Sequence, residues 1–527
     1  MKKILAILLV TAQMSYAQIS IGTINPDPSA VLEVNSTTKG FLIPRMTKSQ
    51  INNISNPTEG LMVYCTDCNP KGINVYMDNT FIGVSEEPTF ELSDFPVQGK
   101  IYKRDKITNI APINIAGKIH YNYGASSVIL EIYRNNVLQS TQTETLTGLD
   151  SNNKYSFSFS TTITAELASY KFVLKTNTDL VLREASDVMA GDIYIVTGQS
   201  NSIGTKNNPT SNSNSYVKTF GSPNIFTNNL NILSTKGIGD IGFHVADRIV
   251  NNEGIPVLVF NGGRSGRPIQ FFQRNDADKY DSSTNYGLLL TRFVNAGYLP
   301  TDVTSFIWYQ GESNGTDTTL IDYNSLFNEL YNDWEEDFNP DHYYVVQVHK
   351  VGCGIDITSE IPEAHRQLGL TYPDITVVSS NGALQGSDQC HYYGTDGYET
   401  IAERIYNLMD YRYYNATGTA GILSPDVTNV RFGSASKNTI KFDLLPATDT
   451  YTLGGNINDD FLIENSSITV TNVSISGNEV TLTLSGTVGT SNPELTYLGE
   501  ILSDTLYIFN QNNIGMLSFK GIAISDF

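Results

Sequence analysis

Short apolar runs alternate with helical patterns of apolar residues across the middle of the chain. The runs cover residues 192–197, 256–261, 305–310, 343–349 and 375–380, and each has the length of a buried strand. Apolar positions recur at helical spacing in residues 241–252, 323–338, 361–370 and 396–414. This alternation predicts an α/β domain, in which helices cover both faces of a parallel sheet. In the last helix, Asp396 and Glu399 have the spacing of a capping box.

The two flanking regions show another pattern, in which apolar and polar residues alternate one by one. SVILEIYR and KYSFSFSTTI lie within residues 87–186, and TIKFDLL and NEVTLTLSG lie within residues 420–527. Single alternation interrupted by turn residues is typical of β-sandwiches. We therefore expect a sandwich domain on each side of an α/β domain that spans residues 187–415.

The front of the mature chain, residues 18–86, is rich in Asn, Thr, Pro and Gly and has only short apolar runs. The stretch NPDPSAVLEVNSTTKGFLIPRMT resembles a module at the front of exported, fibre-like bacterial proteins. This resemblance implies a small structural or tethering module and no chemistry.

The first 17 residues have the pattern of a secretory signal peptide. Lys2 and Lys3 precede an apolar stretch at residues 4–12, and Ser15-Tyr16-Ala17 has the small residues of a cleavage site. No later stretch reaches the roughly 20 apolar residues that span a bilayer. We expect an exported protein, periplasmic or extracellular, that has no membrane span.

The charge of the chain excludes one class of partner. Its 33 Lys and Arg residues face 54 Asp and Glu residues, which gives a formal net charge of −21. Binding to a phosphate backbone relies on clustered cations. The balance therefore argues against nucleic acid, and the acidic residues are spread along the chain as they are on a solvated surface.

Four cysteines in an exported chain favour disulfides. Cys65 and Cys68 have the spacing of a zinc half-site, but no second CxxC or His pair accompanies them. A short-loop disulfide is therefore the preferred interpretation. Cys353 and Cys390 remain, and a bridge between them would restrain the loop that carries His391. The histidines show no metal-ligand spacing, so we expect neither a metal nor a cofactor.

Polar residues follow the expected strands at the edge where ligands bind in parallel sheets. They are Gly198-Gln199-Ser200-Asn201, Gly262-Gly263-Arg264-Ser265-Gly266, Gln310-Gly311-Glu312-Ser313-Asn314 and, before the final helix, Asp388-Gln389-Cys390-His391. Each set alone is an ordinary turn or a surface ion pair. Their common position at strand ends predicts one site.

A serine nucleophile needs a base within hydrogen-bond reach and a third group that orients the base. Asp388 lies three residues before His391, so its carboxylate can reach Nδ1 of the imidazole and leave Nε2 facing Ser200. We therefore predict a triad of Ser200, His391 and Asp388. The oxyanion formed by attack needs preorganised donors. The candidates are the N–H groups of Ser200 and Gly266 and the amide of Gln310, with Asn314 as the second choice.

Three further residues are candidates for substrate contact. Arg264 and Arg267 follow the second strand, and either guanidinium could pair with a substrate carboxylate. The alternative is a solvated arginine or an ion pair with Asp276 or Asp278. His349 ends a strand at the same edge of the sheet, so it could line the pocket.

These motifs resemble the conserved blocks of SGNH-type esterases, in particular sialate O-acetylesterases and related carbohydrate acetylesterases. The resemblance rests on GQSN, SGRPI, WYQGESN and DQCHYYGTDGY and covers roughly residues 189–414. It implies a flavodoxin-like hydrolase domain, a Ser-His-Asp triad at Ser200, His391 and Asp388, no metal, and removal of acetyl groups from sugar hydroxyls. It also implies that Glu312 is a buried structural carboxylate.

The sequence favours a secreted carbohydrate O-acetylesterase that acts on an acetylated glycan. One alternative keeps the chemistry and changes the substrate to acetylated xylan or another plant polysaccharide. A second alternative is a glycan-binding protein without activity, suggested by the flanking sandwiches and the fibre-like front module. The intact set of Ser200, His391 and Asp388 speaks against the second alternative. Oligomeric state does not follow from the sequence.

Overall fold

The computed structural model describes residues 18–68, 71–77, 79–84, 90–204, 214–221, 225–227, 237–315, 319–349, 360–392, 394–489, 491–498 and 506–527. The predicted signal peptide lies outside these residues. The chain forms two compact units. One comprises Met1–Glu91, Gly117–Ser126 and Leu146–Phe157, and the other comprises Leu92–Ala116, Ser127–Thr145 and Ser158–Phe527.

The predicted parallel sheet is present. Its strands are β14 (Val181–Gly198), β15 (Val217–Gly221), β17 (Val257–Asn261), β18 (Ser305–Tyr309), β19 (His342–Gln347) and β20 (Ile375–Ser379). β14 lies at the centre, with Val196 opposite Asn261 of β17 on one side and Ile307 of β18 on the other. The sheet continues from β18 through β19 to β20, and from β17 to β15. All five predicted strands are confirmed, and β15 is an additional one.

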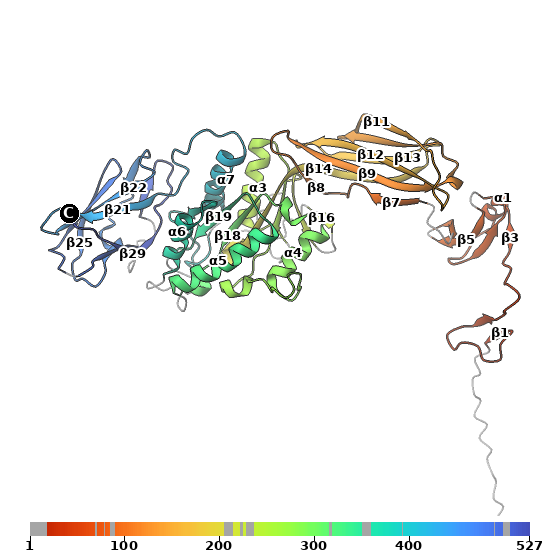
Figure 1. Cartoon of the computed structure of the whole chain (residues 1–527), viewed down its shortest axis with the longest axis horizontal. Helices are drawn as coiled ribbons and strands as arrows, with labels where there is room; N and C mark the ends of the chain where they lie inside the picture. The colour runs from red at the N-terminus through yellow and green to blue at the C-terminus, as the bar shows by residue number, and fades with distance from the viewer. Residues whose placement is uncertain are drawn as a thin grey trace, which may run out of the picture. The chain divides into compact units, whose positions relative to one another are not determined.

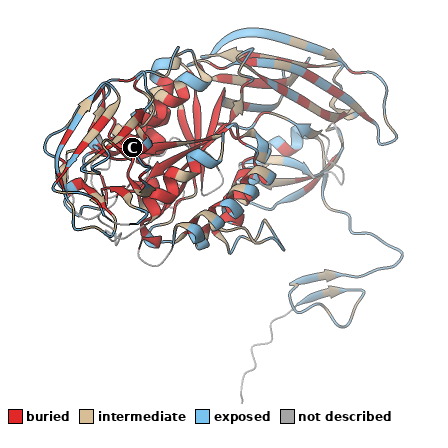
Figure 2. Cartoon of the chain, turned by 60° about the vertical axis from the view of Figure 1, so that its left-hand side comes forward, coloured by how far each residue is buried: buried red, intermediate tan, exposed pale blue. Residues whose placement is uncertain are grey.

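Helices cover this sheet and bury its strands (Figures 1 and 2). They are α3 (Asp240–Glu253), α4 (Asn285–Asn295), α5 (Leu320–Asp337), α6 (Ile361–Thr371) and α7 (Glu399–Tyr413). α3 packs against α7, and α5 packs against α6. The predicted capping box at the start of the last helix is wrong. A π-helical turn, Gly394–Tyr398, precedes α7, whose N-cap Tyr398 makes no side-chain cap.

β14 belongs to two domains at once. Its first half pairs antiparallel with β13 (Tyr170–Thr176), where Phe172 lies opposite Ala185, and its second half forms the middle of the parallel sheet. The expected domain boundary at residues 186 and 187 therefore falls inside one continuous strand. The other strands of this antiparallel region are β7 (Phe90–Asp94), β8 (Ile101–Lys103), β9 (Ile110–His120), β10 (Ser127–Arg134), β11 (Val137–Thr145) and β12 (Lys154–Thr164).

The C-terminal region is built from antiparallel strands around its own apolar core. A four-stranded sheet has the order β21 (Asp426–Phe432), β22 (Thr439–Leu445), β26 (Glu479–Leu484), β25 (Val470–Ser476), and a three-stranded sheet has the order β24 (Phe461–Ile463), β27 (Glu494–Tyr497), β29 (Phe519–Ala523). β23 (Tyr451–Leu453) pairs with β28 (Ile508–Asn510). Phe442 and Phe519, from the two larger sheets, share one core, as expected of a sandwich. Asn381 Nδ2 donates to the carbonyl of Met516 at 2.7 Å, which joins this region to the α/β domain.

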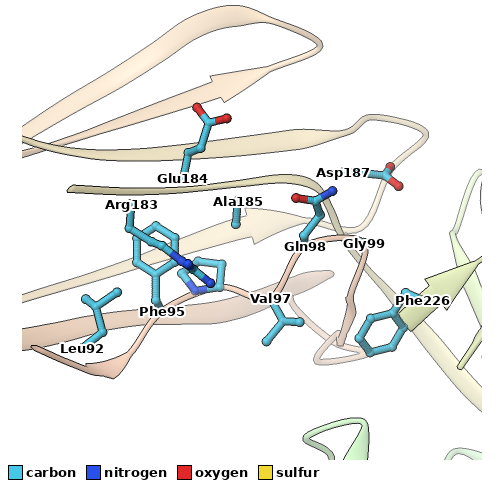
Figure 3. Close-up of a pocket in the computed structure, with 11 residues that line it drawn as sticks. Leu92, Phe95, Val97, Gln98, Gly99, Arg183, Glu184, Ala185, Asp187 and Phe226 are labelled. Carbon is cyan, nitrogen blue, oxygen red and sulfur yellow. The ribbon is translucent and has the colours of Figure 1, made fainter. Parts of the chain in front are cut away.

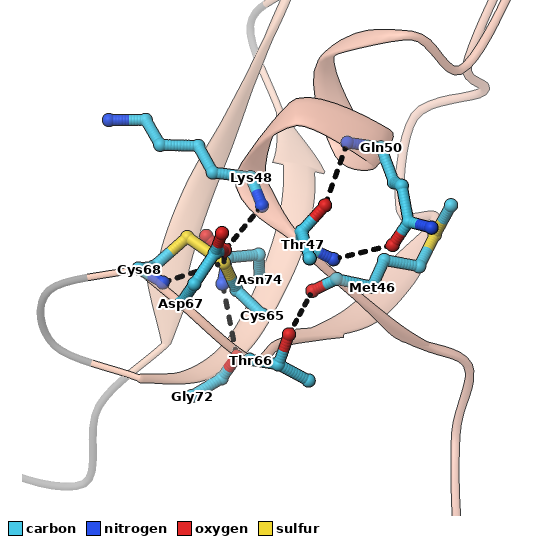
Figure 4. Close-up of a disulfide and its surroundings, with 10 residues drawn as sticks. All are labelled: Met46, Thr47, Lys48, Gln50, Cys65, Thr66, Asp67, Cys68, Gly72 and Asn74. Carbon is cyan, nitrogen blue, oxygen red and sulfur yellow. Dashed lines mark hydrogen bonds between the residues drawn. A yellow bond between two sulfur atoms is a disulfide. The ribbon is translucent and has the colours of Figure 1, made fainter.

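The front module is small and has a minimal core. Its elements are β1 (Ile19–Ile21), β2 (Leu32–Val34), β3 (Arg45–Met46), α1 (Lys48–Asn52), β4 (Met62–Cys65), β5 (Gly72–Met77) and β6 (Thr80–Val84). Thr47 and Gln50 form a capping box at α1, and the predicted Cys65–Cys68 disulfide is present beside it (Figure 4). The core consists of buried Ile51, Val63 and Cys65, with Met46, Ile54, Cys68 and Phe81 packed against them.

Candidate active site

Ser200 lies where the central strand meets a short helix. β14 ends at Gly198, and Ser200 is the first residue of α2 (Ser200–Ile203). Gly198 has φ 129°, and a Cβ at this position would lie 2.1 Å from the carbonyl oxygen of Tyr309. Only glycine allows strands β14 and β18 to approach so closely at the point where the chain turns. The local sequence therefore places the Ser200 hydroxyl at the end of the sheet, as predicted.

The loop after β17 packs directly on the Ser200 helix. The N–H of Arg264 donates to the carbonyl of Gly198 at 2.8 Å. A Cβ on Gly263 would lie 2.4 Å from Oγ of Ser202, so this loop cannot carry a side chain there. Gly266 has φ 65° and open space around its Cα, and it lies in an exposed part of the loop. Its role as an oxyanion donor stays a prediction.

The amides of the loop after β18 are engaged inside the protein. Gln310 is fully buried, and its Nε2 donates to the carbonyl of Arg267 at 3.2 Å and to Oδ1 of Asn314 at 2.7 Å. Oδ1 of Asn314 also accepts from the N–H of Ile269 at 2.9 Å. These bonds fasten the second and third loops together. For Gln310 to serve the oxyanion, one of its two N–H bonds would have to be exchanged for the substrate oxygen.

Asp388 and His391 form the predicted pair. Nδ1 of His391 lies 2.9 Å from Oδ2 of Asp388, while Oδ1 of Asp388 accepts the N–H groups of His391 at 3.0 Å and of Cys390 at 3.1 Å. Partial burial opposes ionisation of Asp388, but the bonds from the His391 backbone and ring and from Cys390 outweigh it and hold the pKa of the carboxyl well below its usual range. A carboxylate acceptor places the proton on Nδ1 and leaves Nε2 as the basic atom.

The loop of His391 touches the helix of Ser200. Nδ2 of Asn201, the residue after Ser200, donates to the carbonyl of Cys390, the residue before His391, at 3.1 Å. Residues almost 200 positions apart in the sequence thus come together at one end of the sheet. Cys390 is disulfide-bonded, and its expected partner, Cys353, lies outside the described residues.

Two buried carboxyl groups lie near the Ser200 helix. Glu312 is 4% exposed and accepts from Asn201, and burial raises its pKa to about 7. This fits the structural role that the resemblance implies. Asp240, at the start of α3, is equally buried, and burial raises its pKa to about 7. Neither of its oxygens has a hydrogen-bond partner among the described residues. Sequence reasoning missed Asp240, because an acidic residue in the first turn of a helix is unremarkable.

The three predicted substrate contacts have different surroundings. The guanidinium of Arg267 lies 4.8 Å from the centre of the Phe271 ring. Arg264 lines a small pocket with Arg292, between the loop after β17 and α4. The alternative of an ion pair with Asp276 is not realised, because Asp276 pairs with Arg274. Nε2 of His349 lies 3.1 Å from Oη of Tyr507 in the C-terminal sandwich, which favours a structural role for His349.

Two side-chain groups among the described residues have metal-ligating atoms close together. They are Cys65, Asp67 and Cys68, and Asp388, Cys390 and His391. Both groups contain disulfide-bonded cysteines, whose sulfurs are not available as thiolate ligands. The second group is therefore better explained by the Asp388–His391 pair.

A pocket of about 750 Å³ lies away from these residues, where the end of β7 approaches β14 and β16 (Ile225–Thr227). Phe95, Gln98, Arg183, Asp187 and Phe226 are among its lining residues (Figure 3). It contains none of the predicted catalytic residues. None of the described helices is both long enough and apolar enough to span a bilayer.

Comparisons with known proteins agree with this geometry. Residues 190–410 match the family model described as carbohydrate esterase, sialic acid-specific acetylesterase, and residues 20–94 match a phage tail like trimerisation region. No curated protein sequence matches the chain.

Solved structures show the fold. A carbohydrate acetylesterase from Xanthomonas citri is 15% identical, with a TM-score of 0.54 over 80% of this chain and 97% of its own. A protein from Arabidopsis thaliana is 19% identical, with a TM-score of 0.35 over 42% of this chain and 99% of its own. The mixed α/β fold with a central parallel sheet is thus shared with a carbohydrate acetylesterase.

The family match spans the parallel sheet from β14 to β20 and all four loops at its end. It agrees with the resemblance that the motifs of these loops show. Residues 190–410 therefore form a domain of the sialic acid-specific acetylesterase family of carbohydrate esterases, and the chain is a carboxylic-ester hydrolase.

Proposed function

We propose that the protein is an exported O-acetylesterase that removes acetyl groups from the hydroxyls of a glycan with Ser200, His391 and Asp388. The observation that carries this proposal is the Asp388–His391 pair, which is held against the helix of Ser200 by the bond from Asn201 to Cys390. A serine at a strand end, a base of fixed tautomer and a carboxylate that orients the base are the parts that acyl transfer requires.

The reaction proceeds in two halves. Nε2 of His391 takes the Ser200 proton as Oγ attacks the acetyl carbonyl carbon, and the same proton passes to the sugar oxygen as the ester bond breaks. Water then attacks the acetyl-serine, His391 again moves the proton, and acetate leaves. Asp388 stays ionised and stabilises the imidazolium of both steps, because its pKa is held far below neutrality.

The charges near the site favour an acidic sugar. Arg264 and Arg292 line one small pocket, and neither forms an ion pair among the described residues. Nη2 of Arg292 is buried without a hydrogen-bond partner there, so positive charge is left uncompensated in an otherwise acidic chain. A carboxylate on the substrate, as in a sialic or uronic acid, would complement it. Acetylated xylan is the second candidate substrate.

A panel of substrates tests the activity and the substrate class together. We expect acetate release from p-nitrophenyl acetate and from O-acetylated sugars, with a higher kcat/KM for an O-acetyl sialic acid than for acetylated xylan. Arg264→Gln should reduce kcat/KM about tenfold on the acidic sugar and leave p-nitrophenyl acetate hydrolysis unchanged, because a lost charge-assisted bond costs roughly one to three kcal/mol. Glycan retention without any acetate release would instead support a binding protein.

The front module suggests that three chains act together. Residues 20–94 match a trimerisation region, and the module leaves large apolar side chains uncovered. Ile24 is 93% exposed, Leu42 is 77% exposed and Phe41 is 69% exposed. The parallel pair β1–β2 has no buried residue at all, and a two-stranded sheet is not stable alone. We propose that these residues are buried between three copies of the chain, which would present three esterase sites to a polymeric glycan.

Light scattering on the full mature chain tests this assembly. We expect three times the mass of one chain, and the double variant Phe41→Asp/Leu42→Asp should reduce it to that of one chain while kcat on p-nitrophenyl acetate is kept. The matched control is Leu370→Asp in α6, since Leu370 is 66% exposed but lies outside the module. A monomeric wild type, or a trimer in the double variant, would contradict the assembly.

A further inference from the structure

Asn201 is bound on three sides at the base of the site. Its Nδ2 donates to Oε1 of Glu312 at 2.6 Å and to the carbonyl of Cys390 at 3.1 Å, and its Oδ1 accepts from the hydroxyl of Tyr398 at 2.8 Å. Both N–H groups of the amide and its oxygen are therefore used. Asn201 is 2% exposed and Tyr398 is fully buried, so water does not compete for these bonds.

The three partners come from segments that the site must hold together. Asn201 follows Ser200 on α2, Glu312 lies in the loop after β18, and Cys390 precedes His391. Tyr398 stands just before α7. One side chain thus connects the helix of Ser200 to the loop of His391. The Glu312 bond fixes the orientation of the amide that makes this connection.

Glu312 has no other side-chain task among the described residues. Its Oε2 is buried without a hydrogen-bond partner, and an unpartnered carboxyl oxygen in the interior destabilises the fold. The side chain makes a short bond to Asn201 with the other oxygen. Retention of a carboxyl group in such surroundings suggests that its contact with Asn201 serves the site.

We propose that Asn201 and Glu312 act as a positioning pair, which sets the loop of His391 at reacting distance from Ser200. Glu312 accepts one N–H of Asn201 and so directs the other N–H to the carbonyl of Cys390. Neither residue touches the substrate or moves a proton. The inference rests on the proposed function, because it needs His391 to be the base for Ser200.

The pair predicts a loss of turnover without a loss of binding. In Asn201→Ala both links to the neighbouring loops are removed, so kcat on p-nitrophenyl acetate should fall about 100-fold, which is the typical effect of a displacement near 1 Å in a site. KM should change less than about threefold. Glu312→Ala should have a similar effect, whereas Glu312→Gln keeps an oxygen that can accept the N–H of Asn201 and should retain kcat within about fivefold.

Two controls separate positioning from support of the fold. Tyr398→Phe removes a buried hydroxyl bond but leaves both Nδ2 bonds of Asn201, so it should lower Tm and reduce kcat less than tenfold. The double variant Asn201→Ala/Glu312→Ala should be no slower than either single variant, because residues that act as a unit are not additive.

The outcomes distinguish this inference from the function on which it rests. An active wild type in which Asn201→Ala keeps its kcat would overturn the positioning pair and leave the esterase assignment intact. Equal losses in Glu312→Gln and Glu312→Ala, or additive losses in the double variant, would overturn it as well. An inactive wild type would count against the function itself.

Discussion

Replacing Ser200 by alanine should reduce the hydrolysis of p-nitrophenyl acetate and of acetylated sugars by at least about 10⁴-fold in kcat, to the level left by the remaining groups of the site. The hydroxyl forms the acetyl intermediate, and the described residues that pack around it offer no other nucleophile in its place. KM should change little, since the substrate still meets the same loops. The measurement is acetate release by purified wild type and variant at matched concentrations.

The neighbouring Ser202 provides a matched control for Ser200. It lies on the same helix, two residues further on, but its Oγ is buried and donates to the carbonyl of Gln199 at 2.6 Å. Ser202→Ala loses one internal hydrogen bond, which costs about 1 kcal/mol of stability, and should keep kcat within about tenfold. If Ser200→Ala and Ser202→Ala have similar activities, Ser200 is not the nucleophile.

The sheet could be predicted because its strands have a local signal. Each of the five predicted strands is a run of apolar residues buried on both faces, and such runs stand out without any knowledge of the fold. β15 has the sequence Val217-Lys218-Thr219-Phe220-Gly221 and carries two polar residues, yet all five are buried. Lys218 is accommodated by an ion pair with Asp187 from β14, a partner that no local pattern could indicate.

The candidate site divides in the same way. The Asp388–His391 pair could be predicted because its two members are close in sequence and a loop can bring them together. The surroundings of Gln310 and His349 could not, because they depend on Arg267 and Tyr507 from other parts of the chain. Asn201 was part of a recognised motif, but its bonds to Glu312 and Cys390 appear only after folding.

Domain limits were the least predictable feature. The composition changes near residue 187, which suggests a boundary, but the backbone runs through it as the single strand β14 from Val181 to Gly198. The first half of this strand faces antiparallel neighbours and the second half faces parallel ones. A strand that changes partners keeps the same backbone form, so nothing in its own residues marks the change. The Ser200 helix is thereby attached directly to the antiparallel region.

Asp388→Asn should lower kcat by about 10³- to 10⁴-fold and leave KM nearly unchanged. The reason lies in the two backbone N–H groups, of Cys390 and His391, that bind Oδ1 of Asp388. An asparagine must turn its carbonyl oxygen toward these donors, so its NH₂ group faces Nδ1 of His391. The ring then accepts at Nδ1 and carries its proton on Nε2, where it can no longer take the proton of Ser200. Initial rates at several substrate concentrations would measure both constants.

Asp396→Asn is the matched control, since Asp396 is an exposed acidic residue in the π-helical turn that follows the same loop. It removes the same charge from the same region and should leave kcat within about twofold, because an exposed charge acts through water and salt. A large loss in both variants would mean that the region needs negative charge and not a particular tautomer. An Asp388→Asn protein as active as wild type would show that His391 is oriented by another group. Only a loss confined to Asp388→Asn ties the chemistry to the hydrogen bond between this carboxylate and the ring.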